Sequence, residues 1–179
     1  MSNQTLPLSR SFALGVSERS VSALKQLLQE RDSLFARLQS LQLRTQVSDS
    51  VSVSDSGSDS GSEESDDQAA PVQPLSLAEE VALSMGQSLQ VFAGTHIDAA
   101  LSCLAHNRRA FDSIKAEIEP AMVEHLLDSA RDDIAYGPLM GFSAEAVGVA
   151  DMFMVEEHVR AARAIHDRIS ALLAQSEQS

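Results

Sequence analysis

The residues best suited to chemistry are a thiol and an imidazole close together in the chain. Cys103, the only cysteine, stands three residues before His106. On a helix this spacing places the two side chains one turn apart, as in half of a zinc site or in a thiol and its general base. No second pair completes a zinc site, and a helix interior offers no obvious oxyanion donors. The pattern favours a buried cysteine beside a surface histidine.

Other catalytic signatures are missing from the sequence. No histidine has a glutamate three residues before it, which excludes the Glu-x-x-His pattern of di-iron bundles. There is no phosphate-binding glycine loop, no G-x-S-x-G and no H-E-x-x-H. The neighbouring acids of 132–133 and 156–157 would point about 100° apart on a helix, as on solvated faces. We expect no enzyme, no cofactor and no metal; a small enzyme or metal-binding bundle is the remaining alternative.

Charge is distributed unevenly in this acidic chain of net charge −13. Residues 1–45 carry six bases and three acids, residues 46–70 seven acids and no base, and residues 71–179 seven bases and sixteen acids. A body of this charge should repel nucleic acid, because duplex affinity comes mostly from neutralised phosphates. No segment resembles a signal peptide or a membrane span. We therefore expect a cytoplasmic protein, with a nuclear location or export without a signal peptide as alternatives.

A heptad pattern marks residues 17–45, after a flexible N-terminus expected over 1–16. The inner positions are Leu24, Leu27, Arg31, Leu34, Leu38 and Leu41. This a/d spacing is typical of a coiled-coil helix, whose stripe must be buried against another helix. We interpret the segment as an arm that pairs with partner helices or with its own copy; alternatively it is one helix of the chain's own bundle.

An acidic Ser/Asp/Gly tract joins this helix to the rest of the chain. With few apolar residues and charge of one sign, residues 46–74 should be a disordered linker. Ser52, Ser56 and Ser60 each have an acid three residues on, which suits an acid-directed Ser/Thr kinase. The tract is predicted to be a spacer and a phosphorylation switch.

The body, residues 75–175, shows helical periodicity throughout. Ser76 and Glu79 form a capping box, Gly94 is expected to end the first helix and Thr95 to cap the second, and Pro120 should begin the third. The first helix is expected to turn Val81, Met85, Leu89 and Phe92 inward, and the second Ile97, Leu101, Leu104, Phe111, Ile114 and Ile118, with Arg108 near the inner side. The fold class is thus all-α: an antiparallel four-helix bundle over about 76–175, with the coiled-coil-like N-terminal helix attached through the linker.

The last predicted helix, from Ser143 to about Ala174, carries a second heptad stripe and precedes a frayed tail at 176–179. Its stripe consists of Val155, His158, Ala162, Ile165, Ile169 and Leu172. An imidazole at an inner position could make association sensitive to pH. Two surfaces remain: the apolar turn at 135–142, and the basic cluster at 106–109, where phosphorylated serines of the linker could dock.

These features together favour a non-enzymatic helical subunit or adaptor that binds other helical proteins or its own copy. A virus structural protein or a leaderless secreted effector that binds host proteins is the alternative from another class.

Overall fold

The computed structural model describes residues 6–51, 74–136 and 144–178, and these ranges are almost entirely helical. The elements in chain order are α1 (Leu6–Val51), α2 (Leu77–Ala105), α3 (Arg108–Asp112), the 3-10 turn η1 (Lys115–Glu117), α4 (Pro120–Tyr136) and α5 (Ala144–Ser176). The all-helical class predicted from the sequence is therefore confirmed, with five α-helices packed together.

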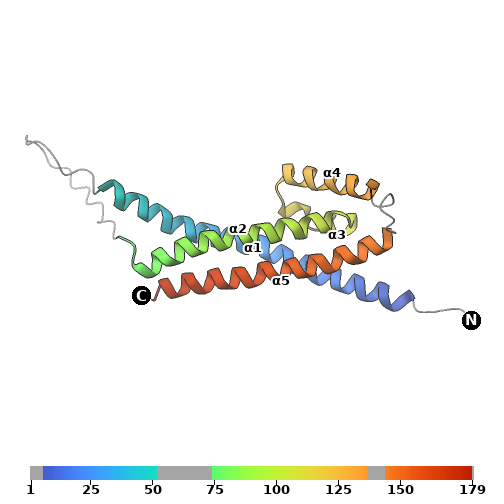
Figure 1. Ribbon diagram of the computed structural model, residues 1–179, viewed down its shortest axis with the longest axis horizontal. Coiled ribbons are helices and arrows are strands. Elements are labelled where there is room, and N and C mark those ends of the chain that lie inside the picture. Colours follow the sequence, from blue (N-terminus) through green and yellow to red (C-terminus); the bar gives the residue numbers. More distant parts are fainter. Residues whose placement is uncertain (1–5, 52–73, 137–143, 179) are drawn as a thin grey trace, which may run out of the picture.

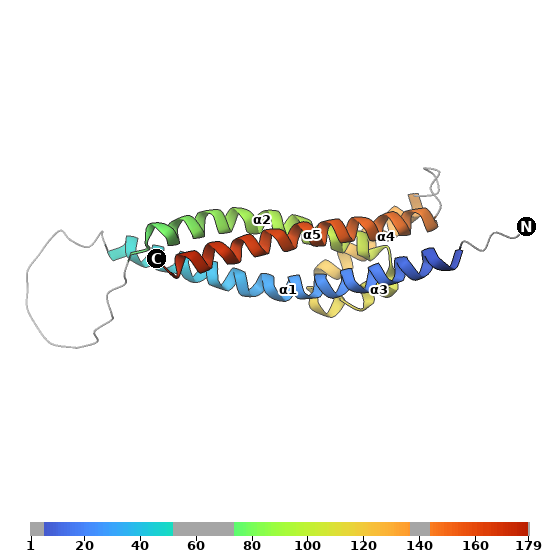
Figure 2. The ribbon, with the colours of Figure 1, turned by 90° about the horizontal axis from the view of Figure 1, so that it is seen from below.

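Three long helices form an elongated bundle. Helices α1 and α5 run in the same direction and α2 runs against both, as the colours in Figures 1 and 2 show. The most extensive packing is between α2 and α5, and α1 lies against both of them. The short helices α3 and α4 cover one end of this bundle, over the C-terminal part of α2 (Figure 1).

Helix α1 is part of the chain's own core in this arrangement. At one end Val21, Leu24, Leu27 and Leu28 join residues of α2, α4 and α5 around Phe111, which is completely buried. At the other end Leu34, Leu38 and Leu41 pack with Ile169 and Leu173 of α5. The stripe that the heptad pattern identified is thus covered by the body of the same chain. Helix α1 also extends beyond the predicted range of 17–45 at both ends.

Arg31 departs from its predicted inner position. Its side chain is 39% exposed and its Nε lies 3.2 Å from Oδ1 of Asp32. Leu28, only 4% exposed, takes the inward position one turn earlier. A guanidinium would have to be desolvated in the core, so the charged group turns out to the solvent at the edge of the stripe.

The predicted break at Gly94 was wrong, because α2 continues from Leu77 to Ala105 without interruption. Glycine inside a helix costs about 1 kcal/mol relative to alanine, but burial of the neighbouring Ala93 and Ile97 outweighs this local preference. Thr95 does not cap a new helix; its hydroxyl donates to the carbonyl oxygen of Val91 within α2.

For three of its four residues, the inner face predicted for the first part of α2 was also wrong. Val81, Met85 and Phe92 are 43%, 43% and 62% exposed, whereas Leu89 is partly buried and packs against the core cluster that contains Leu38. The buried face consists of the small residues Ala82, Gly86 and Ala93. A Cβ added at Gly86 would lie 2.6 Å from Cδ2 of Leu38, so the small residues let α1 approach closely and leave the larger ones outside.

After Ala105 the chain turns instead of continuing as one helix to Ile118. The Asn107 side chain accepts a hydrogen bond from the Ala110 backbone N–H and so caps α3. This turn brings Phe111, Ile114 and Ile118 into the core. Arg108, predicted near the inner side, is 65% exposed and pairs with Asp112. Helix α4 then begins at Pro120, as predicted.

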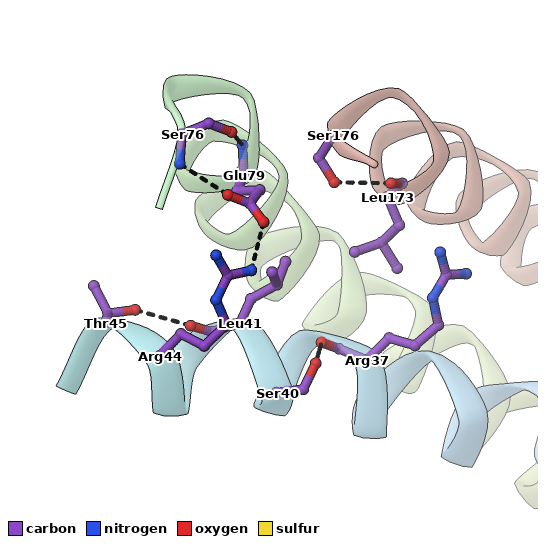
Figure 3. Close-up of polar contacts among 9 residues, drawn as sticks. All are labelled: Arg37, Ser40, Leu41, Arg44, Thr45, Ser76, Glu79, Leu173 and Ser176. Carbon is purple, nitrogen blue, oxygen red and sulfur yellow. Dashed lines mark hydrogen bonds and ion pairs between the residues drawn. The ribbon is translucent and has the colours of Figure 1, made fainter. Parts of the chain in front are cut away.

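Polar contacts hold the opposite end of the bundle (Figure 3). Ser76 and Glu79 make the predicted capping box, and Glu79 also pairs with Arg44 of α1 at 2.5 Å. Ser176 is 7% exposed and donates to the Leu173 carbonyl, while Glu177 pairs with Arg37 at 2.6 Å. The end of α5 therefore packs on α1, where a frayed tail was expected.

Several predicted features lie outside the described residues. They include almost all of the acidic linker, with Ser52, Ser56 and Ser60, most of the apolar turn at 135–142, and the first five residues of the chain. No helix in the described ranges combines the length and the apolar character that crossing a bilayer requires.

Candidate functional site

His106 lies between two carboxylates of different helices. Its Nε2 is 3.3 Å from Oδ2 of Asp133 on α4, and its Nδ1 is 3.3 Å from Oδ2 of Asp151 on α5. The second pair is buried and not aligned for a hydrogen bond. Because the two ring nitrogens face opposite sides, they cannot bind one metal ion together. The arrangement is a polar clasp that joins the C-cap of α2 to α4 and α5.

The thiol beside this clasp is poorly suited to nucleophilic chemistry. Burial raises the pKa of Cys103, and the nearby Asp151 carboxylate raises it further. Burial also raises the pKa of Asp151, with His106 opposing this effect and Asp133 adding to it. A reactive cysteine requires the opposite environment, one that stabilises the thiolate. Cys103 is partly buried against the core, close to the role that its sequence context suggested.

Among the described residues, no group of three or more His, Cys, Asp or Glu side chains is arranged to hold a metal ion. The closest pair of imidazoles is His96 of α2 and His158 of α5, whose Nδ1 atoms are 3.1 Å apart. Such a contact requires one nitrogen to donate and the other to accept. His158, predicted at an inner heptad position of the last helix, thus has its partner within the same chain, on α2.

The other predicted interaction residues are mostly in the core. In α1, Leu24, Leu27, Leu34, Leu38 and Leu41 are all buried, and in α5 so are Val155, Ala162, Ile169 and Leu172, while Ile165 is partly buried. These residues meet one another within the chain, so α1 could pair with a partner helix only after leaving its place. Pairing of the α1 stripe with another chain stays a prediction.

A partly buried polar cluster between α1 and α5 was not predicted from the sequence. Arg163 of α5 pairs with Glu30 of α1, and His166 lies beside them with its Nδ1 3.9 Å from Oε2 of Glu30. Burial lowers the pKa of His166, while the pKa of Glu30 is lowered mainly by the hydrogen bond from Arg163. The sequence signal was the spacing of Arg163 and His166, which lie one turn apart on the side of α5 that meets α1.

The most unusual surface lies on the N-terminal two thirds of α2. Residues 81–97 contain no Asp, Glu, Lys or Arg, although more than one residue in five of the chain is charged. Within this stretch, and at Leu77 just before it, large apolar side chains face the solvent: Leu77 is 76% exposed, Val91 70%, Phe92 62%, and Val81 and Met85 43% each. We call these five residues the α2 patch. Exposed uncharged patches of this size commonly mark interaction sites.

The C-terminal continuation of this face of α2 is already covered by a helix. Counting from Phe92 in steps of three or four residues leads to His96, Ala99, Cys103 and His106, which therefore lie on one side of α2. Cys103 packs against the core cluster that contains α4, and His106 contacts Asp133 of α4. Helices α4 and α5 thus contact the C-terminal end of this face, whereas the large side chains of the α2 patch are exposed in the described structure.

Two hydroxyl groups around the α2 patch, those of Ser88 and Thr95, bond to their own helix. Ser88 donates to the Ser84 carbonyl at 3.2 Å and Thr95 to the Val91 carbonyl at 3.1 Å. Covering a hydroxyl that already has an acceptor leaves no unsatisfied group. A neighbouring helix could therefore pack over these serine and threonine residues without forming new hydrogen bonds to them.

The basic cluster at 106–109 contributes to a separate, open depression of about 530 Å³ between α1 and α3. Asn107 and Arg109 line it together with Lys25, Glu18 and Ser22 of α1 and with Ser113. The depression carries two cations and one acid, and His106 points into the clasp described above. Docking of phosphorylated linker serines at this cluster stays a prediction.

Comparison with protein families, with characterised proteins and with solved structures finds no match for this chain.

Proposed function

We propose that this protein is a non-enzymatic helical interaction subunit or adaptor, and that the α2 patch is its docking surface. The proposal rests on residues 81–97 of α2, which contain no charged side chain and expose several large apolar ones. Glu80 and Asp98 flank this stretch in a chain of net charge −13. Interface centres are depleted of charged residues and enriched in Phe and Met. Phe92 and Met85 supply these residue types here.

The expected partner element is an amphipathic helix. Helix α4 packs on the C-terminal part of α2, so a partner helix laid on the patch would lie next to α4 along α2. Phe92 is the strongest candidate for an energetic anchor, because the few hot-spot residues at the centre of an interface are often large aromatic side chains. Truncation of such a residue costs about 2 kcal/mol or more, about a 30-fold change in affinity.

The linker and α1 have supporting roles in this proposal. The acidic tract serves as a spacer between α1, which continues to Val51, and α2, which begins at Leu77. Phosphorylation of Ser52, Ser56 and Ser60 by an acid-directed kinase would add about −1.5 to −2 charges each to this tract. Helix α1 supports the patch from behind, since Leu38 packs on Gly86.

The test uses the full chain expressed in its native cells. Val81→Glu places a charge in the patch, whereas Ala171→Glu places the same charge at an exposed position of α5 outside the patch. We expect the protein in native extracts to elute at a smaller apparent mass as Val81→Glu and unchanged as Ala171→Glu. Equal elution of wild type and both variants, with unchanged helix content, would contradict the proposal.

A further inference from the structure

A heptad stripe runs along the exposed side of α2. Leu77, Val81, Ser84, Ser88, Val91 and Thr95 follow one another in alternating steps of four and three residues, and all six are exposed. This spacing is the a/d pattern of a coiled coil, and it faces the solvent instead of the core. Met85 and Phe92 flank the stripe on one side.

The stripe is nearly the same when read in either direction. Reversed about its centre, it pairs Leu77 with Thr95, Val81 with Val91 and Ser84 with Ser88. In an interface between two identical chains related by a two-fold axis, residue i contacts residue j of the other copy and j contacts i, so each of these pairs would occur twice. Two such helices, packed antiparallel, would bring small serines together at the axis and valine against valine on each side of it.

A second copy of this acidic chain would meet little electrostatic repulsion on this surface. Two chains of net charge −13 repel each other wherever their acids meet. Residues 81–97 carry no formal charge, so contact there adds no local repulsion. The hydroxyls of Ser88 and Thr95 are already bonded within their own helix, so their burial leaves no unsatisfied donor.

The area of the patch is sufficient for a dimer of modest affinity. Five large side chains that are 43–76% exposed amount to roughly 500 Å² per chain, at the upper end of the largest patches on monomers. Two chains would then bury about 1,000 Å², the lower limit for a specific interface.

We infer that the α2 patch binds the α2 patch of a second copy of this chain, antiparallel, with the two-fold axis between Ser84 and Ser88. The inference rests on the proposed function, because it names the occupant of the same docking surface. Val81 of each copy then faces Val91 of the other.

Charge exchange tests this arrangement in the purified full chain. Val81→Glu and Val91→Lys each bury an unpaired charge twice per dimer, so each should raise the dissociation constant at least tenfold by light scattering over a concentration series. In the double variant, Glu at 81 of one copy meets Lys at 91 of the other, and association should recover to within a few-fold of the wild type. Within one chain the two positions are about 15 Å apart along the helix, too far to compensate each other strongly. Ala171→Glu should associate like the wild type.

Two results would overturn the inference: a wild-type chain that is monomeric at every concentration, or single variants that associate as tightly as the wild type. Single variants that dissociate without recovery in the double variant would overturn the antiparallel pairing. If the purified chain is monomeric but Val81→Glu still reduces the mass of the complex in cell extracts, the second-copy inference fails and the proposed function stands, with a foreign helix as the occupant.

Discussion

Two glycines of α2 provide a matched test of whether α1 is packed against the body. Gly86 and Gly94 both lie inside α2, and replacing either by alanine should gain about 1 kcal/mol from helix propensity. A Cβ at Gly94 would meet no atom within 4 Å, so Gly94→Ala should raise the free energy of unfolding by roughly this amount. The same change at Gly86 places Cβ 2.6 Å from Cδ2 of Leu38, a side chain that is only 2% exposed.

Overpacking of this kind costs about 1–3 kcal/mol, so Gly86→Ala should leave stability unchanged or lower it by up to about 2 kcal/mol. The two substitutions should therefore differ by about 1–3 kcal/mol in urea unfolding followed by circular dichroism. Leu38→Ala removes the side chain that a Cβ at position 86 would meet, and it should itself lower the free energy of unfolding by about 2–5 kcal/mol. In the Leu38→Ala background, Gly86→Ala should become stabilising. If Gly86→Ala stabilises the otherwise wild-type chain as much as Gly94→Ala does, Leu38 is not against α2 and the packing of α1 described above is wrong.

Four further predictions concern the titratable groups. The lowered pKa of His166 means that the folded chain binds fewer protons there than the unfolded chain, so stability should fall as the pH falls through about 6.5; His166→Gln should flatten this dependence in urea titrations at several pH values. The lowered pKa of Glu30 adds a further loss of stability below about 4.5, which Glu30→Gln should remove. The raised pKa of Asp151 has the opposite effect on stability, because the ionised carboxylate is disfavoured in the folded chain. Asp151→Asn should therefore raise the thermal midpoint at pH 7, and the difference from the wild type should become smaller in acid, where the wild-type carboxyl is protonated. A lower midpoint of the variant at pH 7 would contradict this. Cys103, with its raised thiol pKa, should react with a thiol reagent at pH 8 at least tenfold more slowly in the native chain than in urea, and equal rates would refute its burial.

Features that depend on neighbouring residues were predictable from the sequence. The capping box of Ser76 and Glu79 and the start of α4 at Pro120 both appear as expected. In each case the backbone groups at a helix end are satisfied within a few residues, so distant parts of the chain have little influence.

The break expected at Gly94 shows where such local rules fail. Glycine often ends helices because it tolerates a left-handed conformation, but here the chain gains more by keeping Ala93 and Ile97 in the core, each 1% exposed. A preference of about 1 kcal/mol is small beside the burial of two apolar side chains.

The partner of the α1 stripe could not be predicted from periodicity. A leucine stripe fits any helix with a complementary face, and the sequence does not state whether that helix belongs to the same chain. In the structure α2 and α5 supply it.

The α2 patch was misassigned because hydrophobic residues were assumed to face inward. Small residues at 82, 86 and 93 form the buried side, which allows close helix contact and leaves Val81, Met85 and Phe92 outside. The uncharged run of residues 81–97 was the signal that could have identified this surface from the sequence. Likewise, the contacts of His106 with Asp133 and Asp151 join positions too far apart in the chain for spacing rules to connect.

The most direct measurement of the central claim is amide hydrogen exchange of the dilute purified chain, at concentrations where it is monomeric. The claim is that α1 belongs to the chain's own core and that the interaction surface lies on α2. Amides of residues 24–41 should then exchange as slowly as those of α2 and α5, in one cooperative unit. Rapid exchange across 24–41 beside protected α2 and α5 would show a free α1 with its leucines available to other proteins, and would contradict the account.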